Sequence, residues 1–150
     1  MKKTLLIITA VMLVVGCSNK PEKEYINAEK LNEENGLMYH PDTKELYSGN
    51  VFKKYLGGKS QLEGSYKDGK RDGLWTEWHE NGQKWQEGTY KDGEVDGKGT
   101  SWYENGQKKE EATYKDGMPD GLWTYWYENG QKWYEATWKD GKQIGKTKWY

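Results

Sequence analysis

The 150-residue chain has little cysteine, histidine and proline, with one, two and three residues of each. Cys17 has no second cysteine to pair with, so an intramolecular disulfide is impossible. The histidines, His40 and His79, lie far apart in sequence, which argues against a zinc site. The formal net charge is −1. Because a nucleic-acid surface needs a basic excess to displace counterions, we exclude nucleic acid as a partner.

Aliphatic side chains are also scarce beyond residue 60. The nine tryptophans and twelve tyrosines must therefore supply most of the buried apolar surface, at about 150 to 250 Å² each. An aromatic content of 15% favours an ordered domain although 31% of the residues are charged. Glycine recurs every few residues and no apolar stripe has a 3.6-residue period, so helices are excluded.

The chain has one long apolar run, from Leu5 to Val15, which is too short to span a bilayer. Two lysines precede it and Gly16-Cys17 follow it, so residues 1–16 are predicted to be a lipoprotein signal peptide. The alternative is a plain secretory peptide that is cleaved nearby.

The four residues that end at Cys17 look like the lipobox of bacterial lipoproteins. We therefore expect Cys17 to be acylated, for example with palmitate, and to anchor the protein to a membrane. The next residue, Ser18, is not aspartate, which by similarity to lipoprotein sorting favours the outer membrane of the cell envelope. Residues 17–35 are predicted to be a charged tether.

The remaining chain is a tandem repeat with a period of 24 residues. Lys-Asp-Gly follows an aromatic residue at four positions 24 apart, namely Tyr66, Tyr90, Tyr114 and Trp138. Glu-Asn-Gly recurs with the same step. We divide a repeat domain over residues 36–150 into the units 48–71, 72–95, 96–119 and 120–143, with a partial fifth unit at 144–150. Residues 36–39 are expected to form an N-terminal cap strand.

Asn-Gly and Asp-Gly are strong signals for tight turns, and the segments between them are rich in Trp, Tyr and Thr. The fold class predicted is all-β: an antiparallel β-meander of 24-residue hairpins in a single twisted sheet. If Asn81-Gly82 is a two-residue loop, the register pairs Leu74 with Thr89, Trp75 with Gly88, Thr76 with Glu87, Glu77 with Gln86, Trp78 with Trp85 and His79 with Lys84.

This register places Trp75, Tyr90 and Trp123 on one face, which we expect to be the better packed. Trp75 is expected to lie over Gly88, so Gly88→Val should cost about 1 to 3 kcal/mol by overpacking. The opposite face should carry an aromatic ladder of Trp78, Trp85, Trp102, Trp126 and Trp133. Its alternative explanation is that these rings only pack against the sheet.

Residues 73–93, GLWTEWHENGQKWQEGTYKDG, resemble the bacterial variant of the MORN repeat, and the resemblance covers about residues 36–150. That variant is found in lipoproteins and in proteins grouped as YwqK-type antitoxins. The resemblance implies a β-hairpin array without cofactors or catalytic residues. The antitoxin grouping implies a protein that binds and neutralises a protein toxin.

Candidate reactive groups are present but repeat with the unit period. Glutamates recur in triplicate beside the turns and within the strands, whereas a catalytic pair needs one asymmetric environment. Ser-His-Asp chemistry lacks a nucleophile elbow. The acidic loops fit neither the EF-hand nor the nonapeptide calcium repeat. We therefore predict no enzyme activity, no metal and no cofactor, with a glycosidase as a remote alternative.

Two functions remain. The first is a lipid-anchored module that binds an envelope or secreted protein, such as a toxin, because tryptophan and tyrosine dominate binding hot spots. The residues expected to contact this partner are Trp78, Trp85, Trp102, Trp126, Trp133, Tyr125 and Tyr134. The alternative is a carbohydrate or peptidoglycan binder whose aromatic ladder stacks on sugar rings. Tandem Trp, Tyr and Asn-Gly repeats are similar to those of cell-wall-binding modules, although those have a shorter period.

Overall fold

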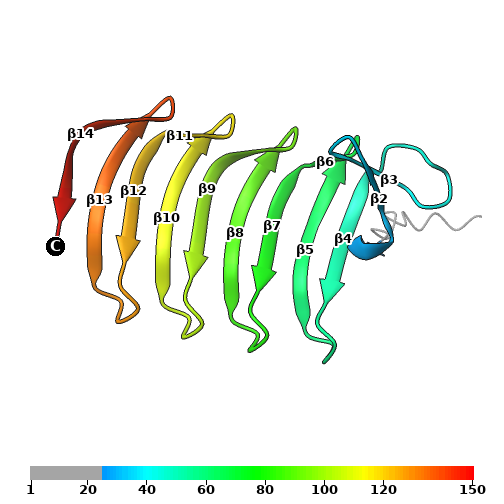
Figure 1. Ribbon diagram of the computed structural model, residues 1–150, viewed down its shortest axis with the longest axis horizontal. Helices are drawn as coiled ribbons and strands as arrows, with labels where there is room; N and C mark the ends of the chain where they lie inside the picture. Colours follow the sequence, from blue (N-terminus) through cyan, green and yellow to red (C-terminus); the bar gives the residue numbers. More distant parts are fainter. Residues whose placement is uncertain (1–24) are drawn as a thin grey trace, which may run out of the picture.

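The computed structural model describes residues 25–150, which form two sheets of twelve and two strands (Figure 1). The expected signal peptide and Cys17 lie outside the described residues. A 3₁₀ turn, η1 (Ala28–Lys30), accompanies the strands. Within residues 25–150 no helix combines the length and the apolar character that crossing a bilayer requires.

The large sheet follows the sequence order almost without interruption, as β1-β4-β5-β7-β8-β9-β10-β12-β13-β14. Its strands are β1 (Tyr25–Asn27), β4 (Gly49–Lys54), β5 (Ser60–Lys67), β6 (Lys70–Arg71), β7 (Gly73–Trp78), β8 (Lys84–Lys91), β9 (Glu94–Trp102), β10 (Lys108–Lys115), β11 (Met118–Pro119), β12 (Gly121–Trp126), β13 (Lys132–Lys139) and β14 (Lys142–Trp149). The short strands β6 and β11 pair with β5 and β10. All pairs are antiparallel except that between β1 and β4. Figure 1 shows one curved, open layer, so the predicted all-β hairpin meander is confirmed.

An N-terminal cap closes one end of this layer. It contains β1, η1 and the two-stranded sheet of β2 (Asn32–Glu34) and β3 (Leu37–Tyr39). The cap packs on a core of Tyr47, Val51, Tyr66 and Trp75, to which it contributes Ile26, Ala28, Leu31 and Met38. The expected cap strand at 36–39 corresponds to β3. Residues 25–35, expected to belong to the tether, form the rest of the cap because Ile26, Ala28 and Leu31 pack, partly buried, against this core.

The two kinds of turn differ. The Asp-Gly of each Lys-Asp-Gly sequence forms a turn with both residues at positive φ, as in Asp92 (51°) and Gly93 (94°), which is the type I′ geometry of a two-residue hairpin loop. At Asn81-Gly82 only the glycine has positive φ, at 92°. The His79 N–H donates to the Gln83 carbonyl at 2.8 Å, so three residues form this loop. Three-residue loops of this kind carry a bulge in the strand that follows.

Because of that bulge, the observed register between β7 and β8 differs in part from the predicted one. The predicted pairs from Leu74–Thr89 to Glu77–Gln86 are all observed. The register then shifts, and Trp78 pairs with Lys84 instead of Trp85. The predicted pair of His79 and Lys84 is wrong for the same reason. β12 and β13 have the equivalent shift, which pairs Trp126 with Lys132.

Hydrogen bonds with the repeat period tie each hairpin to the next. The glycine N–H of each Asp-Gly turn donates to a carbonyl 22 residues earlier, for example Gly93 to Arg71 at 2.9 Å and Gly117 to Val95 at 2.9 Å. At the opposite edge the Asn81 Nδ2 donates to the Glu104 carbonyl at 2.7 Å. The turn residues that define the repeat in sequence therefore also join neighbouring units.

Candidate functional site

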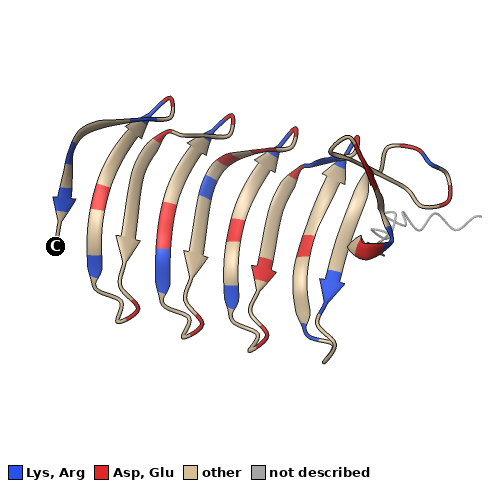
Figure 2. Ribbon diagram, in the orientation of Figure 1, with Lys and Arg blue, Asp and Glu red and all other residues tan. Residues whose placement is uncertain are grey.

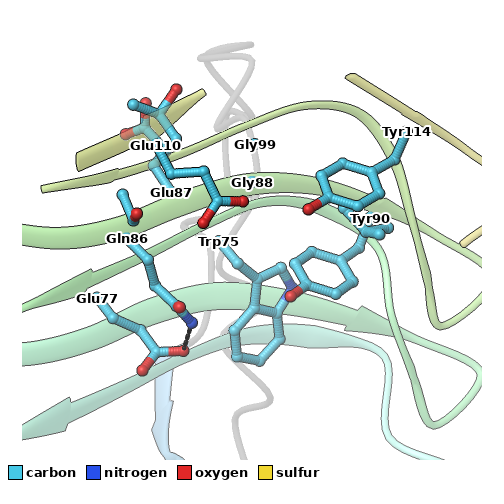
Figure 3. Close-up of a pocket in the computed structure, with 12 residues that line it drawn as sticks. Trp75, Glu77, Gln86, Glu87, Gly88, Tyr90, Gly99, Glu110 and Tyr114 are labelled. Carbon is cyan, nitrogen blue, oxygen red and sulfur yellow. Dashed lines mark hydrogen bonds between the residues drawn. The ribbon is translucent and has the colours of Figure 1, made fainter. Parts of the chain in front are cut away.

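The two faces of the sheet are distinguished by the residues of β7. We call them the Trp75 face and the Thr76 face, since successive side chains of a strand point to opposite sides. Trp75, Glu77 and Gln86 line one cavity (Figure 3). On the reverse, the Thr76 hydroxyl donates to Glu87 at 3.1 Å. Trp75 is 2% exposed, so the side expected to be better packed does bury its tryptophan.

Three of the expected partner-binding residues lie on the Thr76 face: Trp78, Trp102 and Trp126, all half-buried. The Lys84 ammonium lies 5.6 Å from the Trp102 ring centroid, and Lys108 lies 5.7 Å from that of Trp126. These separations allow cation–π attraction. The indoles of the predicted ladder are therefore partly covered by lysines from the preceding hairpin.

The prediction that Trp85 and Trp133 share this ladder is wrong. The Trp133 ring contacts Tyr125 (centroid distance 6.4 Å), and Tyr125 stacks on Trp123 at 5.9 Å, which places Trp133 on the Trp75 face. Trp85 is the residue of β8 that the register shift leaves without a cross-strand partner, and its ring lies 6.4 Å from that of His79, the contact equivalent to that of Trp133 with Tyr127. A bulge adds a residue to one strand, and the side chain of that extra residue does not follow the alternation that a regular hairpin imposes.

A continuous group of rings results at the end of the sheet formed by β12, β13 and β14. We define the C-terminal aromatic cluster as Tyr125, Tyr127, Trp133, Tyr134 and Trp149, which are linked by ring-to-ring contacts with centroid distances of 4.7 to 6.4 Å. Trp133 is 40% and Trp149 is 64% exposed. The cluster contains Trp133, Tyr125 and Tyr134 of the expected set, whereas sequence reasoning omitted Trp149.

The Tyr125 hydroxyl has a strongly altered acidity within this cluster. Burial, together with the nearby Glu110 charge and Tyr134, raises the pKa of Tyr125 well above its ordinary value. The hydroxyl therefore remains protonated and can only act as a neutral hydrogen-bonding group at physiological pH.

The repeated glutamates have structural partners. Glu87, Glu111 and Glu135 form ion pairs with Lys84, Lys108 and Lys132, each lysine three residues earlier in the chain. Figure 2 shows these acidic positions as bands midway along β8, β10 and β13. Burial raises the pKa of Glu111, but hydrogen bonds from Lys108 and Lys98 outweigh it and hold that pKa below its ordinary value.

The histidine of the second unit also has a structural contact. The His79 Nε2 lies 3.3 Å from the Trp102 carbonyl, and in the next unit the Tyr103 hydroxyl donates to the Trp126 carbonyl at 2.8 Å. Histidine thus takes the place of a tyrosine that joins two hairpins. Among residues 25–150, no group of three or more His, Cys, Asp or Glu side chains could hold a metal ion.

Trp75 does not occupy the space over Gly88 that the sequence suggested. A Cβ added to Gly64 would lie 2.3 Å from the Trp75 Cδ2, whereas one added to Gly88 would meet only Tyr90, at 3.7 Å, and Val95. The indole therefore leans over β5, where its Nε1 donates to the Ser65 carbonyl at 3.0 Å. The prediction that Gly88→Val would crowd Trp75 is wrong. The strand that carries Trp75, β7, lies between β5 and β8, and the indole packs on β5, whereas Gly88 belongs to β8.

The space over Gly88 belongs instead to a cleft of about 230 Å³ on the Trp75 face, which we call the Gly99 cleft. It is lined by Trp75, Glu77, Gln86, Glu87, Gly88, Tyr90, Val95, Gly99, Thr100, Ser101, Glu110 and Tyr114 (Figure 3). Gly99 lies 24 residues from both Trp75 and Trp123 and has no side chain there. That substitution within the repeat is the sequence signal that could have located the cleft.

Comparison with known proteins agrees with this architecture. Residues 71–92, 95–116 and 119–140 each match the family model described as MORN repeat variant. No curated protein matches the chain. The three matched segments begin 24 residues apart, and each spans a hairpin with its Asn-Gly loop and ends at the aspartate of the Asp-Gly turn that follows.

Repeats of this family often serve as protein- or membrane-interaction modules and are generally non-enzymatic. The repeated contacts of Glu87, Glu111, Glu135 and His79 agree with a structural use of the ionisable side chains. The surfaces that distinguish one unit from another are the C-terminal aromatic cluster and the Gly99 cleft.

Proposed function

We propose that this chain is a non-enzymatic protein-interaction module that binds an envelope or secreted protein through the C-terminal aromatic cluster. The observation that carries the proposal is the exposure of Trp133, Tyr127 and Trp149, at 40%, 44% and 64%, within one contiguous group of rings. Exposed apolar patches of this kind on soluble domains mark interaction sites. Tryptophan and tyrosine are also the residues that most often dominate binding energy.

The geometry of the cluster supports binding more than simple packing. Tyr134 stacks on Tyr125 at 4.7 Å and meets Trp149 at 5.2 Å, so the rings restrict one another before a partner arrives. The side chains of the cluster therefore lose less conformational freedom when a partner binds. Among the described residues 25–150 no second sheet pairs with or continues this end of the layer, and Trp133, Tyr127 and Trp149 are exposed there for contact.

The anchor and the location form part of the same proposal. The lipobox-like residues before Cys17 support a lipid-anchored protein of the cell envelope, held at the outer membrane, and a partner of that compartment such as a secreted toxin. An immunity-like role follows from that compartment and from the antitoxin grouping of similar repeats. Cys17→Ala should move the protein from the membrane fraction to the soluble fraction, and persistence in the membrane fraction would refute the anchor.

The binding surface is tested by co-purification from detergent-solubilised membranes, followed by binding of the recovered partner as a purified protein. Trp133→Ala combined with Trp149→Ala should weaken that binding by about 100-fold or more, because two hot-spot residues are lost. The matched control is Leu74→Ala with Leu122→Ala, which removes exposed apolar side chains from the Thr76 face. Equal binding by both double variants would contradict the proposal.

A carbohydrate or peptidoglycan binder remains the second candidate, and the regular spacing of Trp78, Trp102 and Trp126 along the Thr76 face favours it. Successive indoles could stack on successive sugar rings. Sedimentation with purified cell wall tests this candidate, with Trp102→Ala expected to reduce retention. Retention no greater than that of an unrelated protein would exclude it.

A further inference from the structure

We propose that the Gly99 cleft binds the side chain of an arginine presented by a partner protein. The proposal rests on the proposed function for the source of that arginine. Its site adjoins the C-terminal aromatic cluster at Glu110, which pairs with Tyr125 across β10 and β12, and its test requires only a small probe.

The cleft exists because the third unit has glycine, Gly99, where the units before and after it have Trp75 and Trp123. Trp75 packs closely against Gly64 of the adjacent strand, and Gly88 is the position equivalent to Gly64 one unit later. The residue that would cover Gly88 in the same way is Gly99. With no side chain there, the backbones of two adjacent strands form a flat floor between Trp75 and Tyr114 (Figure 3).

The volume of the cleft limits the size of the group that can bind in it. Sites for drug-sized molecules usually enclose about 300 to 1,000 Å³. At about 230 Å³ the Gly99 cleft is smaller and fits one large side chain better than a cofactor or an oligosaccharide. A side chain held in such a slot would add specificity to a larger protein interface.

The charges of the cleft favour a cation. Its lining contains neither lysine nor arginine, and two of its three glutamates, Glu77 and Glu110, belong to the Trp75 face, whereas the Glu87 carboxylate lies on the Thr76 face. Glu87 already has an ion pair with Lys84, whereas neither Glu77 nor Glu110 forms an ion pair with a lysine or arginine of residues 25–150. Figure 3 shows the Glu110 carboxylate directed over the floor toward Trp75, with Glu77 hydrogen-bonded to Gln86.

The rings of Trp75 and Tyr90 already contact a guanidinium outside the cleft, that of Arg71. The Arg71 Cζ lies 4.3 Å from the Trp75 ring centroid and 5.3 Å from that of Tyr90, and its Nη1 donates to the Tyr90 hydroxyl at 3.4 Å. Arg71 does not line the cleft, and its single positive charge does not balance the two carboxylates Glu77 and Glu110. The Trp75 ring is covered by this contact, since it is 2% exposed between Gly64 and Arg71. The ring surface left to the cleft is that of the half-buried Tyr90 and Tyr114.

Arginine fits these features better than lysine or a neutral aromatic residue. Its planar guanidinium stacks on rings and on flat backbone, is weakly hydrated, and donates two parallel hydrogen bonds to a carboxylate. A lysine ammonium is compact and strongly hydrated, so it would gain less from a flat slot. An indole would cover the glycines but would leave the carboxylates without a cationic partner.

The test is an NMR titration of the full-length chain with N-acetyl-arginine amide. We expect saturable shifts at the Gly88 and Gly99 amides and at the Trp75 indole N–H, with a dissociation constant on the order of 1 mM. N-acetyl-citrulline amide has nearly the same shape without the charge, and N-acetyl-lysine amide has the charge without the plane. Both should bind about tenfold more weakly.

Two variants locate the binding. Gly88→Val places a side chain on the floor of the cleft, at a position where an added Cβ has its nearest neighbour at 3.7 Å, and it should abolish the shifts at Gly99. The matched control is Gly57→Val, where an added Cβ meets nothing within 4 Å. Glu110→Gln should weaken binding about tenfold through loss of the charge.

Equal binding of the citrulline probe, tighter binding of N-acetyl-tryptophan amide, or unchanged arginine binding in Gly88→Val would each overturn the proposal. Absence of any shift with the arginine probe would do the same. If these failures accompany a partner that still binds through Trp133 and Trp149, only the cleft proposal falls. If the probe binds but no partner depends on those tryptophans, only the proposed function falls.

Discussion

Trp75 and Trp123 occupy the same position of the repeat but have different surroundings. Trp75 lies near the N-terminal cap, is 2% exposed and donates its indole N–H to the Ser65 carbonyl. Trp123 lies near the end of the sheet formed by β12 to β14, is half-buried, and its buried Nε1 has no hydrogen-bond partner among the described residues. An identical residue in an identical repeat position is therefore a core residue in one unit and a partly exposed one in another.

The different burial of Trp75 and Trp123 has two causes, the residue beside each ring and the N-terminal cap. The strand position beside Trp75 is Gly64, over which the ring lies directly, and the equivalent position beside Trp123 is Ala112. A Cβ at that position prevents an indole from lying as close to the backbone as Trp75 does. The cap then adds the surface that buries Trp75, whereas Trp123 meets Tyr125 and Trp138 at ring distances of 5.9 and 5.3 Å.

The largest expected effect is the loss of the core indole. Trp75→Ala should lower the free energy of unfolding by about 3 to 5 kcal/mol, the usual range for truncating a buried tryptophan. Trp123→Ala should cost clearly less, because its ring is partly exposed and its unsatisfied N–H is removed with it. Urea unfolding followed by circular dichroism measures both. Equal costs would show that the cap does not create a distinct core.

A smaller effect on stability should distinguish Gly64 from Gly88, the glycines of the two strands on either side of Trp75. Gly64→Ala places a methyl group against the Trp75 ring and should cost about 1 to 3 kcal/mol by overpacking. Gly88→Ala meets only ordinary contacts and should stabilise the strand by up to about 1 kcal/mol, since glycine is unfavourable within a strand. Thermal unfolding of the pair gives the comparison. A loss of the same size in both variants would contradict the observed position of Trp75.

The smallest effect concerns the ion pairs on the Thr76 face. The folded-state pKa of Glu111 is below its ordinary value of 4.5, so its contribution is present above that value and is lost as the pH falls through the folded pKa. Glu111→Gln should therefore cost about 0.5 kcal/mol at neutral pH and nothing at strongly acidic pH. Glu128→Gln, in an exposed turn, is the control. A cost that does not change with pH would exclude the ion pairs as its cause.

The repeat and its turns could be predicted because their signals are local. Asp92-Gly93 requires no information beyond its own backbone preferences, and the register from Leu74–Thr89 to Glu77–Gln86 follows from the hairpin between the turns. The prediction stopped being correct at the Asn81-Gly82 loop. Asn-Gly is compatible with both two-residue and three-residue loops, and the choice between them moves Trp85 and Trp133 to the other face.

The candidate sites were harder to predict because they depend on contacts between strands and units. The expected partner set has members on both faces, and Trp149 was missing because its ring neighbours, Trp133 and Tyr134, belong to another strand. The Gly99 cleft depends on the direction in which Trp75 leans. A tryptophan between two small residues, Gly64 and Gly88, can pack over either, and pairing in the hairpin does not decide between them.

The amino-acid sequence by itself determined the hairpin, its 24-residue period and the antiparallel order, because turn propensities and strand alternation act over a few residues. Only the tertiary structure decided which aromatic rings are core, which are exposed and where a cleft remains. Those outcomes depend on a bulge, on the cap and on single Cβ atoms of adjacent strands, which are brought together only when the sheet has formed.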